Sequence, residues 1–293
     1  MKLGIVMEGG ASRTAFSCGV TDCFLEEGLM PDYFVGVSAG IAFGVSYLSG
    51  QRERNKQIIR QYLPDKRYMG FKYLFDRNLK SYYNLPFVFE EVPNELLPFD
   101  YEAFAAYPGE VEAVVTNIKT GKAEYLPVLR DDKKFQAVVA SCALPVLFQP
   151  VKVGNQYYLD GGVADSVPYR RAMEKGCDKI IVILTRARDY IKTKESAIKA
   201  AELLYRHYPK LLERLRNRAD SYNQCMKELY QAERDGSVFV IAPRDTFGVG
   251  RTESSPKRLL KLYEEGYFQA KESMHALQLY LKRQTETKNE IDE

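Results

Sequence analysis

The sequence predicts a three-layer α/β/α fold with a mainly parallel central sheet. Short, fully apolar segments recur along the 293 residues, helix-like amphipathic stretches separate them, and no repeat or low-complexity linker divides the chain. Strands that alternate with helices form parallel sheets covered by helices on both faces. We therefore expect one domain over residues 1–293, with a motif-bearing core at 3–185 and a helical C-terminal third at 195–283 packed on it.

The first predicted elements are a strand at Leu3–Met7, a glycine loop, and a helix at Thr14–Glu27 that ends at Gly28. A second strand, at Tyr33–Val37, leads into a helix after Ser38. The uncharged stretch 33–51 contains too many glycines and serines to be strongly apolar, so we prefer this strand and helix to a membrane span. The remaining predicted strands are Val111–Ile118, Lys179–Thr185 and Val238–Ala242, and the remaining helices are Phe135–Ser141, Ser196–Glu233 and Pro256–Arg283.

Charge and cysteine content exclude several classes of protein. The 42 Lys+Arg and 39 Asp+Glu residues give a net charge of +3, which lacks the basic excess of a nucleic-acid-binding protein. The five cysteines are scattered and form no CxxC pair, so they indicate neither a disulfide framework nor a zinc site. A reducing cytoplasm fits this pattern best. The apolar run Leu3–Met7 is too short for a signal peptide.

A GxSxG motif lies between the second predicted strand and its helix. It reads Gly36-Val37-Ser38-Ala39-Gly40. A serine nucleophile at a strained strand-to-helix turn leaves no room for Cβ atoms two residues to either side, which explains both glycines. The alternative is an ordinary turn in which Ser38 only caps the helix. The motif alone leaves both interpretations open.

A glycine loop follows the first strand. Glu8-Gly9-Gly10-Ala11-Ser12-Arg13 is neither a GxGxxG fingerprint nor a P-loop, because no lysine follows the glycines. Its backbone amides point toward an anion, either a phosphate or the oxyanion of an acyl-transfer intermediate. Arg13 would then hold the loop or meet an anionic headgroup. The alternative is a loop of structural use only.

Histidine is too scarce to supply an obvious general base. His207 and His275 both look like ordinary helical residues, so a carboxylate is the better candidate. Asp160 ends a short apolar strand and precedes Gly161 and Gly162, and we expect it to face the same rim of the sheet as Ser38. The alternative is an Asp-Gly turn without catalytic use.

The glycine loop, the GxSxG and the later DGG, in this order, resemble the patatin-like phospholipase family. The stretches 140–145 and 148–151 and Pro168 are also similar to that family, and the resemblance covers about residues 3–185. It implies a patatin-like α/β fold and a lipid acyl hydrolase with Ser38 as nucleophile, Asp160 as base, and an oxyanion hole at the amides of Gly9, Gly10 and Ala11. It implies no metal or cofactor.

The sequence departs from the family pattern at two positions. The loop begins with Glu8 where the family usually has aspartate, with Ala11 among its glycines, and Ser166 stands where asparagine is frequent. The altered loop leaves two alternatives to lipid ester hydrolysis: a catalytically silent scaffold that binds a membrane or a partner, and an acyltransferase.

Aromatic and basic residues alternate between Tyr62 and Phe89. Such a segment suits the headgroup region of a membrane, so peripheral membrane contact is a further hypothesis. The alternative, which we favour slightly, is a packed subdomain. Both hold if the segment roofs an acyl pocket.

Overall fold

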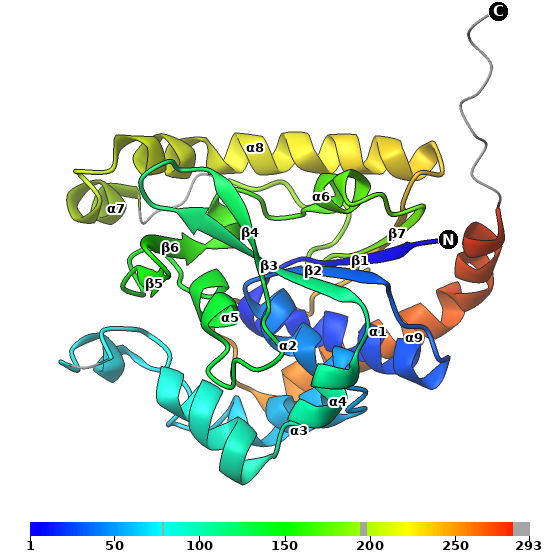
Figure 1. Ribbon diagram of the computed structural model, residues 1–293, viewed down its shortest axis with the longest axis horizontal. Helices are drawn as coiled ribbons and strands as arrows, with labels where there is room; N and C mark the ends of the chain where they lie inside the picture. The colour runs from blue at the N-terminus through cyan, green and yellow to red at the C-terminus, as the bar shows by residue number, and fades with distance from the viewer. Residues whose placement is uncertain (78, 194–197, 284–293) are drawn as a thin grey trace, which may run out of the picture.

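The computed structural model describes residues 1–77, 79–193 and 198–283. Within these ranges an eight-stranded sheet lies between two layers of helices, which confirms the predicted α/β/α fold (Figure 1). The strands are β1 (Leu3–Met7), β2 (Tyr33–Val37), β3 (Glu110–Asn117), β4 (Ala123–Pro127), β5 (Val151–Val153), β6 (Gln156–Asp160), β7 (Lys179–Ile183) and β8 (Phe239–Ile241).

The helices form one layer on each face of the sheet. Helices α6 (Tyr169–Glu174), α7 (Ile198–Leu204) and α8 (Pro209–Arg234) lie on one face, and α1 (Ala15–Glu26), α2 (Ala39–Leu48), α5 (Gln136–Ser141) and α9 (Pro256–Lys282) lie on the other (Figure 1). The remaining segments with helical turns are α3 (Arg54–Gln57), α4 (Tyr101–Ala106), η1 (Ala11–Thr14), η2 (Ile58–Tyr62), η3 (Phe71–Leu74), η4 (Phe87–Leu96) and η5 (Gly161–Val163).

The strands pair in the order β5-β6-β3-β2-β1-β7-β8, with β4 beside β3. From β3 to β8 every pairing is parallel, whereas β4, β5 and β6 add antiparallel pairings at the other side. The sheet is therefore mainly parallel, as predicted. Strands β1 and β2 carry no charged residue along their whole length because both faces of the sheet are covered. In β1, Ile5 and Met7 pack in one core, and Val6 packs in the other.

Helices α1 and α9 approach each other closely at two glycines. A Cβ at Gly19 would lie 1.9 Å from the carbonyl oxygen of Tyr263, and a Cβ at Gly266 would lie 2.0 Å from that of Phe16. No side chain fits into either space. The glycines thus allow the backbones of the two helices to touch.

One predicted helix is two helices in the structure. The prediction Ser196–Glu233 is wrong at its first third, because α7 ends at Leu204 and α8 begins at Pro209. Proline has no backbone N–H to donate the hydrogen bond that would continue the helix. It also disfavours the helical conformation in the residue before it, and Tyr208 adopts φ −123° and ψ 69°. Residues 194–197 lie outside the described ranges, so the predicted start at Ser196 does too.

The segment between α2 and β3 forms an irregular cover over the α2 side of the sheet. Tyr68 and Phe87 are buried in the main core, whereas Phe71 is 69% exposed and Phe75 is 85% exposed. The predicted packed subdomain is confirmed for the first pair, and the second pair faces solvent. Across the described ranges, every helix is too short or too polar to cross a bilayer.

Candidate active site

Ser38 occupies a strained turn between β2 and α2. Its backbone has φ 53° and ψ −126°, a left-handed conformation that is rare for residues other than glycine. A Cβ at Gly36 would lie 2.7 Å from Ile41 Cα, and a Cβ at Gly40 would lie 2.3 Å from the Met7 carbonyl oxygen. Both glycines of the GxSxG are therefore required by close backbone contacts around the serine.

The hydroxyl of Ser141 supports this turn. The Ser38 amide donates a hydrogen bond of 2.8 Å to Ser141 Oγ, and Ser141 is fully buried at the end of α5. The contact gives the strained residue a fixed partner at its backbone. Ser141 belongs to the family-like stretch 140–145, and no pattern in the sequence indicates its contact with Ser38.

Asp160 ends β6 and lies at the level of Ser38. In the pairing register Asp160 is opposite Val115, and Val37 is opposite Val114. The expected proximity is observed, but the reasoning behind it was wrong. Strand β6 runs antiparallel to β3, so Asp160 reaches this level through the register of the pairing and not because parallel strands end at a common rim.

The Asp160 carboxylate is buried and only partly satisfied. It is 2% exposed, and its Oδ1 accepts a hydrogen bond of 2.8 Å from the Gly162 amide. Burial raises the pKa of Asp160, and the nearby Ser38 hydroxyl and Arg218 act in the opposite direction. Although that hydroxyl is near enough to influence the pKa, Oδ2 has no hydrogen-bond partner within 3.5 Å in the described part of the chain. One lone pair of the carboxylate is thus open beside the serine.

The glycine loop lies against the nucleophile candidate. A Cβ at Gly9 would be 2.7 Å from the Val37 carbonyl oxygen and 2.9 Å from Ser38 Cβ. Ala11 adopts φ 49° at the start of η1. Among the hydrogen bonds between described residues, none is donated by the amides of Gly9, Gly10 or Ala11. These three amides are available to an anion beside Ser38, as the oxyanion prediction requires.

Glu8 anchors the loop to two distant elements. Its Oε2 accepts hydrogen bonds from the amide and the hydroxyl of Thr185, at 2.6 and 3.0 Å, and its Oε1 accepts one of 2.9 Å from the Tyr222 hydroxyl. On the far side of the loop, Ser12 donates to the Arg251 carbonyl oxygen through its amide and its hydroxyl. The glycine loop is therefore held between the end of β7, α8 and the segment before α9.

Helix α8 also holds the loop that carries Asp160. Arg218 Nε donates a hydrogen bond of 2.7 Å to the Gly162 carbonyl oxygen, and an Arg214 nitrogen donates one of 2.6 Å to the Ala164 carbonyl oxygen. Ser166 Oγ donates to the Gly162 carbonyl oxygen as well, at 2.8 Å. Nothing in the spacing of these arginines along the sequence indicates which distant carbonyls they reach.

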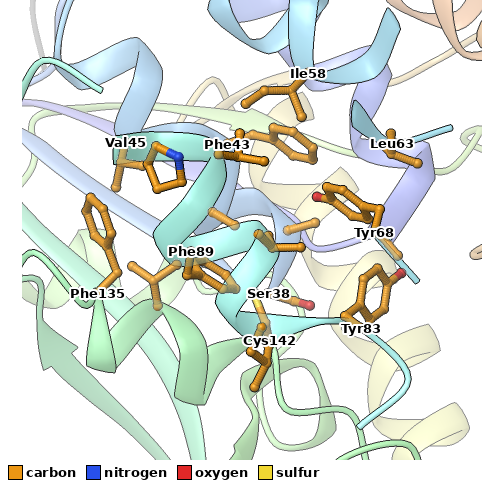
Figure 2. A pocket seen from close by; sticks show the side chains of 18 of the residues that line it. Ser38, Phe43, Val45, Ile58, Leu63, Tyr68, Tyr83, Phe89, Phe135 and Cys142 are labelled. Carbon is orange, nitrogen blue, oxygen red and sulfur yellow. The ribbon is translucent and has the colours of Figure 1, made fainter. Parts of the chain in front are cut away.

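An apolar pocket opens on one side of Ser38. Figure 2 shows Ser38 among the side chains that line it, with Cys142 and Tyr83 beside the serine. The pocket holds about 1020 Å³ of space, its open mouth included, and most of its walls are aliphatic or aromatic. Burial raises the pKa of the Cys142 thiol, which keeps it protonated and a poor competitor for Ser38. Part of the wall comes from the aromatic segment, including Leu63, Tyr68, Tyr83, Leu85, Val88 and Phe89.

The two histidines lie away from this site. His207 is exposed between α7 and α8, where its ring accepts a hydrogen bond from Arg206 Nε, and His275 is exposed on α9. Neither lines the apolar pocket or the polar pocket around Asp160. The Asp160 carboxylate, in contrast, lines the polar pocket together with Ser38.

Two family models match the chain. The model described as patatin-like phospholipase matches residues 5–173, and a model described as a domain of unknown function, DUF6363, matches residues 208–282.

Two individual proteins are also similar to the chain. The uncharacterized protein YjjU of Escherichia coli (strain K12) is 23% identical over 199 residues, which cover 63% of this chain and 52% of that protein. The chain thus spans about half the length of this curated relative. The crystal structure of VipD from Legionella pneumophila matches with a TM-score of 0.43 and 15% identity, over 94% of this chain and 67% of that one.

Proposed function

The chain belongs to the patatin-like phospholipase family, and from this premise we propose that it hydrolyses carboxylic esters of phospholipids or related lipids through Ser38 and Asp160. Family membership supports a lipid acyl hydrolase or esterase in general. One observation carries the finer proposal: the buried Asp160 carboxylate keeps an open lone pair beside a serine in a strained turn.

The proposed reaction has two steps. Asp160 accepts the Ser38 proton while Oγ attacks the ester carbonyl, and the amides of Gly9, Gly10 and Ala11 hold the oxyanion. The intermediate collapses to the acyl-enzyme, and Asp160 returns the proton to the departing alcohol. Water then attacks the acyl-enzyme with Asp160 again as base, which releases the acid and restores Ser38. No step uses a metal or a cofactor.

The raised pKa of Asp160 suits this role. A carboxyl with an ordinary pKa is a weak base toward a hydroxyl, and burial makes its charged form a stronger proton acceptor. The apolar pocket beside Ser38 suits the acyl chain, because its lining excludes water and offers few polar partners.

Two measurements test the serine assignment. Ser38→Ala is expected to abolish turnover of a short nitrophenyl ester while leaving the far-UV circular dichroism unchanged. Unchanged turnover would refute the assignment. A fluorophosphonate probe is expected to label Ser38 in the unmodified protein, and its failure to do so would favour the alternative of a silent scaffold.

A double histidine variant tests the dyad. His207→Gln and His275→Gln together should retain most activity, because both side chains are exposed and neither lines the site. A folded double variant as inactive as Ser38→Ala would restore a triad. Analysis of products from a natural phospholipid would separate release of free fatty acid from transfer of the acyl group to another acceptor.

We further propose that the exposed part of the aromatic segment makes peripheral contact with a membrane. Phe71 and Phe75 are the exposed rings, and Lys72, Arg77 and Lys80 lie between or beside them in the sequence. Rings that insert shallowly and cations that meet lipid phosphates favour an anionic surface.

Vesicle sedimentation tests this contact. Replacing both exposed rings with serine, as Phe71→Ser and Phe75→Ser, should weaken binding to vesicles that contain an anionic phospholipid. Leu279→Ser removes a comparably exposed apolar side chain from α9 and serves as the control. Equal binding of the double variant and the control would contradict the proposal.

A further inference from the structure

A buried arginine lines the apolar pocket. Arg54 is the first residue of α3 and is 6% exposed. Among the described residues that line this pocket, it is the only one with a charged side chain. A pocket that only shields an alkyl chain from water has no use for a cation, so the position of Arg54 indicates a second kind of contact with the ligand.

Arg54 has no carboxylate partner in the described part of the chain. Its Nη1 donates a hydrogen bond of 3.1 Å to Ser46 Oγ, and its Nη2 donates one of 2.9 Å to the Leu97 carbonyl oxygen. Both acceptors are neutral. Nε has no hydrogen-bond partner among the described residues, and the neighbouring Glu53 pairs with Lys56 instead. Described residues thus occupy two of the five N–H donors of the guanidinium.

Arg54 keeps its charge at neutral pH. Burial lowers the pKa of Arg54 to about 10, and the side chains that counteract burial are tyrosines and not carboxylates. Its Cζ lies 5.3 Å from the centre of the Phe99 ring, and that ring packs on Phe135 with 5.3 Å between the ring centres. Aromatic faces attract a cation only weakly compared with a carboxylate. A buried cation with neutral partners is costly, and a carboxylate in the pocket would offset that cost.

Arg54 lies at the end of the pocket away from Ser38. Helix α2 forms one wall and contributes lining residues from Ser38, at its start, to Val45, near its end. Figure 2 shows Val45 apart from Ser38 and next to Phe135. Ser46, to which Arg54 donates, follows Ser38 by eight positions along the helix, which corresponds to a rise of about 12 Å. Because a C–C bond of about 1.5 Å advances an extended chain by about 1.3 Å, a chain of roughly ten carbons spans this distance.

We propose that Arg54 binds a carboxylate at the far end of the acyl chain, so that the protein accepts acyl groups derived from linear dicarboxylic acids of roughly ten carbons. The inference rests on the proposed function for the position of the ester carbonyl at Ser38. The apolar walls then surround the methylene groups, and the terminal carboxylate accepts hydrogen bonds from the N–H donors of Arg54 that the protein leaves unused. Hydrogen bonds between a guanidinium and a carboxylate are among the strongest in proteins. An acyl chain that ends in a methyl group would leave the cation unpaired.

A comparison of two substrates tests this carboxylate site. The ratio of kcat/KM for the mono-nitrophenyl ester of decanedioic acid to kcat/KM for nitrophenyl decanoate is measured for each variant. Arg54→Gln should lower this ratio roughly 10- to 100-fold, the range for loss of a hydrogen bond between charged groups.

Asn55→Ala is the matched control for this comparison. Asn55 is also buried in α3 and donates a hydrogen bond of 3.0 Å to the Phe43 carbonyl oxygen on α2, but it does not line the pocket. The variant should leave the ratio unchanged. Equal ratios in Arg54→Gln and Asn55→Ala would reduce Arg54 to a structural link between α3 and α2 and would overturn the proposal.

Chain length provides a test in the unmodified protein, which does not depend on how any variant folds. The preference for the ester that ends in a carboxylate over the ester that ends in a methyl group should be greater for decanoyl chains than for hexanoyl chains. The shorter chain cannot reach from Ser38 to Arg54. A preference that stays equal or falls as the chain lengthens would contradict the proposal.

A binding measurement separates the carboxylate site from the chemistry. By calorimetry, the Ser38→Ala protein should bind the monomethyl ester of decanedioic acid, and adding Arg54→Gln should weaken this binding roughly 10- to 100-fold. This result, in a protein whose unmodified form turns over no ester, would support the site and refute only the proposed hydrolysis. Equal binding of decanoate would identify a free fatty acid as the ligand and overturn the dicarboxylic ester. Binding that does not change with Arg54→Gln would refute the site.

Discussion

The hydroxyl of Ser141 is expected to set how well Ser38 is positioned. Ser38 adopts a backbone conformation that costs about 1–3 kcal/mol, and its amide is bonded to Ser141 Oγ at 2.8 Å. Ser141→Ala leaves that amide without its partner, at a cost of about 1–3 kcal/mol. If this cost falls on the reactive geometry, kcat/KM drops roughly 5- to 150-fold.

The assay is hydrolysis of a short nitrophenyl ester, together with the rate of fluorophosphonate labelling at Ser38. The pH midpoint of kcat/KM should stay in place while the plateau falls, because Ser141 positions the nucleophile and does not bond the Asp160 carboxylate. Ser17→Ala is the matched control, since Ser17 is equally buried but its Oγ has no hydrogen-bond partner among the described residues. Two results would refute the reasoning: activity of Ser141→Ala within twofold of the unmodified protein, or an equal loss in Ser17→Ala.

Three further outcomes follow from the structure. Asp160→Asn should lower kcat/KM by roughly 10²–10⁴, because it removes the proton acceptor. It should also raise the thermal midpoint at neutral pH, because a protein with a raised carboxyl pKa in its folded state loses stability as pH rises through that pKa. A lower midpoint of the variant in a calorimetric scan would contradict this. The pH profile of kcat/KM should rise along a single ionisation above the ordinary aspartate value of 3.8, and a midpoint at or below 3.8 would exclude Asp160 as base. Gly19→Ala should lower the free energy of unfolding, measured in urea, by about 3 kcal/mol, because the new Cβ would lie 1.9 Å from the Tyr263 carbonyl oxygen. Gly250→Ala is the control and should change this free energy little, because a Cβ there meets nothing within 4 Å.

Strand positions could be predicted well from the sequence because the central strands are buried on both faces. The observed bounds of β1 and β2 equal the predicted ranges Leu3–Met7 and Tyr33–Val37. The direction of β6 could not be predicted, since an apolar run of this length carries no information about its partner. That partner is set by the β5–β6 hairpin and by pairing with β3.

In the site, too, residues with a local sequence pattern could be predicted, whereas residues that act through long-range contacts could not. Ser38 and Asp160 could be singled out because each sits beside glycines that close backbone contacts require. Ser141 and Arg218 could not be singled out, because their hydrogen bonds join residues 103 and 56 positions apart. The end of one helix before Pro209 could have been predicted from the sequence, because proline cannot continue a helix, but the predicted helix ran through it.

The close packing of α9 on α1 has a consequence for how the protein forms. The Asp22 carboxylate accepts a hydrogen bond from the Tyr263 hydroxyl across 241 positions, and the glycine loop is fixed to Arg251 across 239. Such contacts require closure of long loops, and a fold that depends on them is slow to form. During synthesis the nucleophile and its loop emerge long before the residues that hold them. We therefore expect a nascent chain to carry Ser38 in an inactive form until α9 has been made and has docked, so that esterase activity reports completed folding.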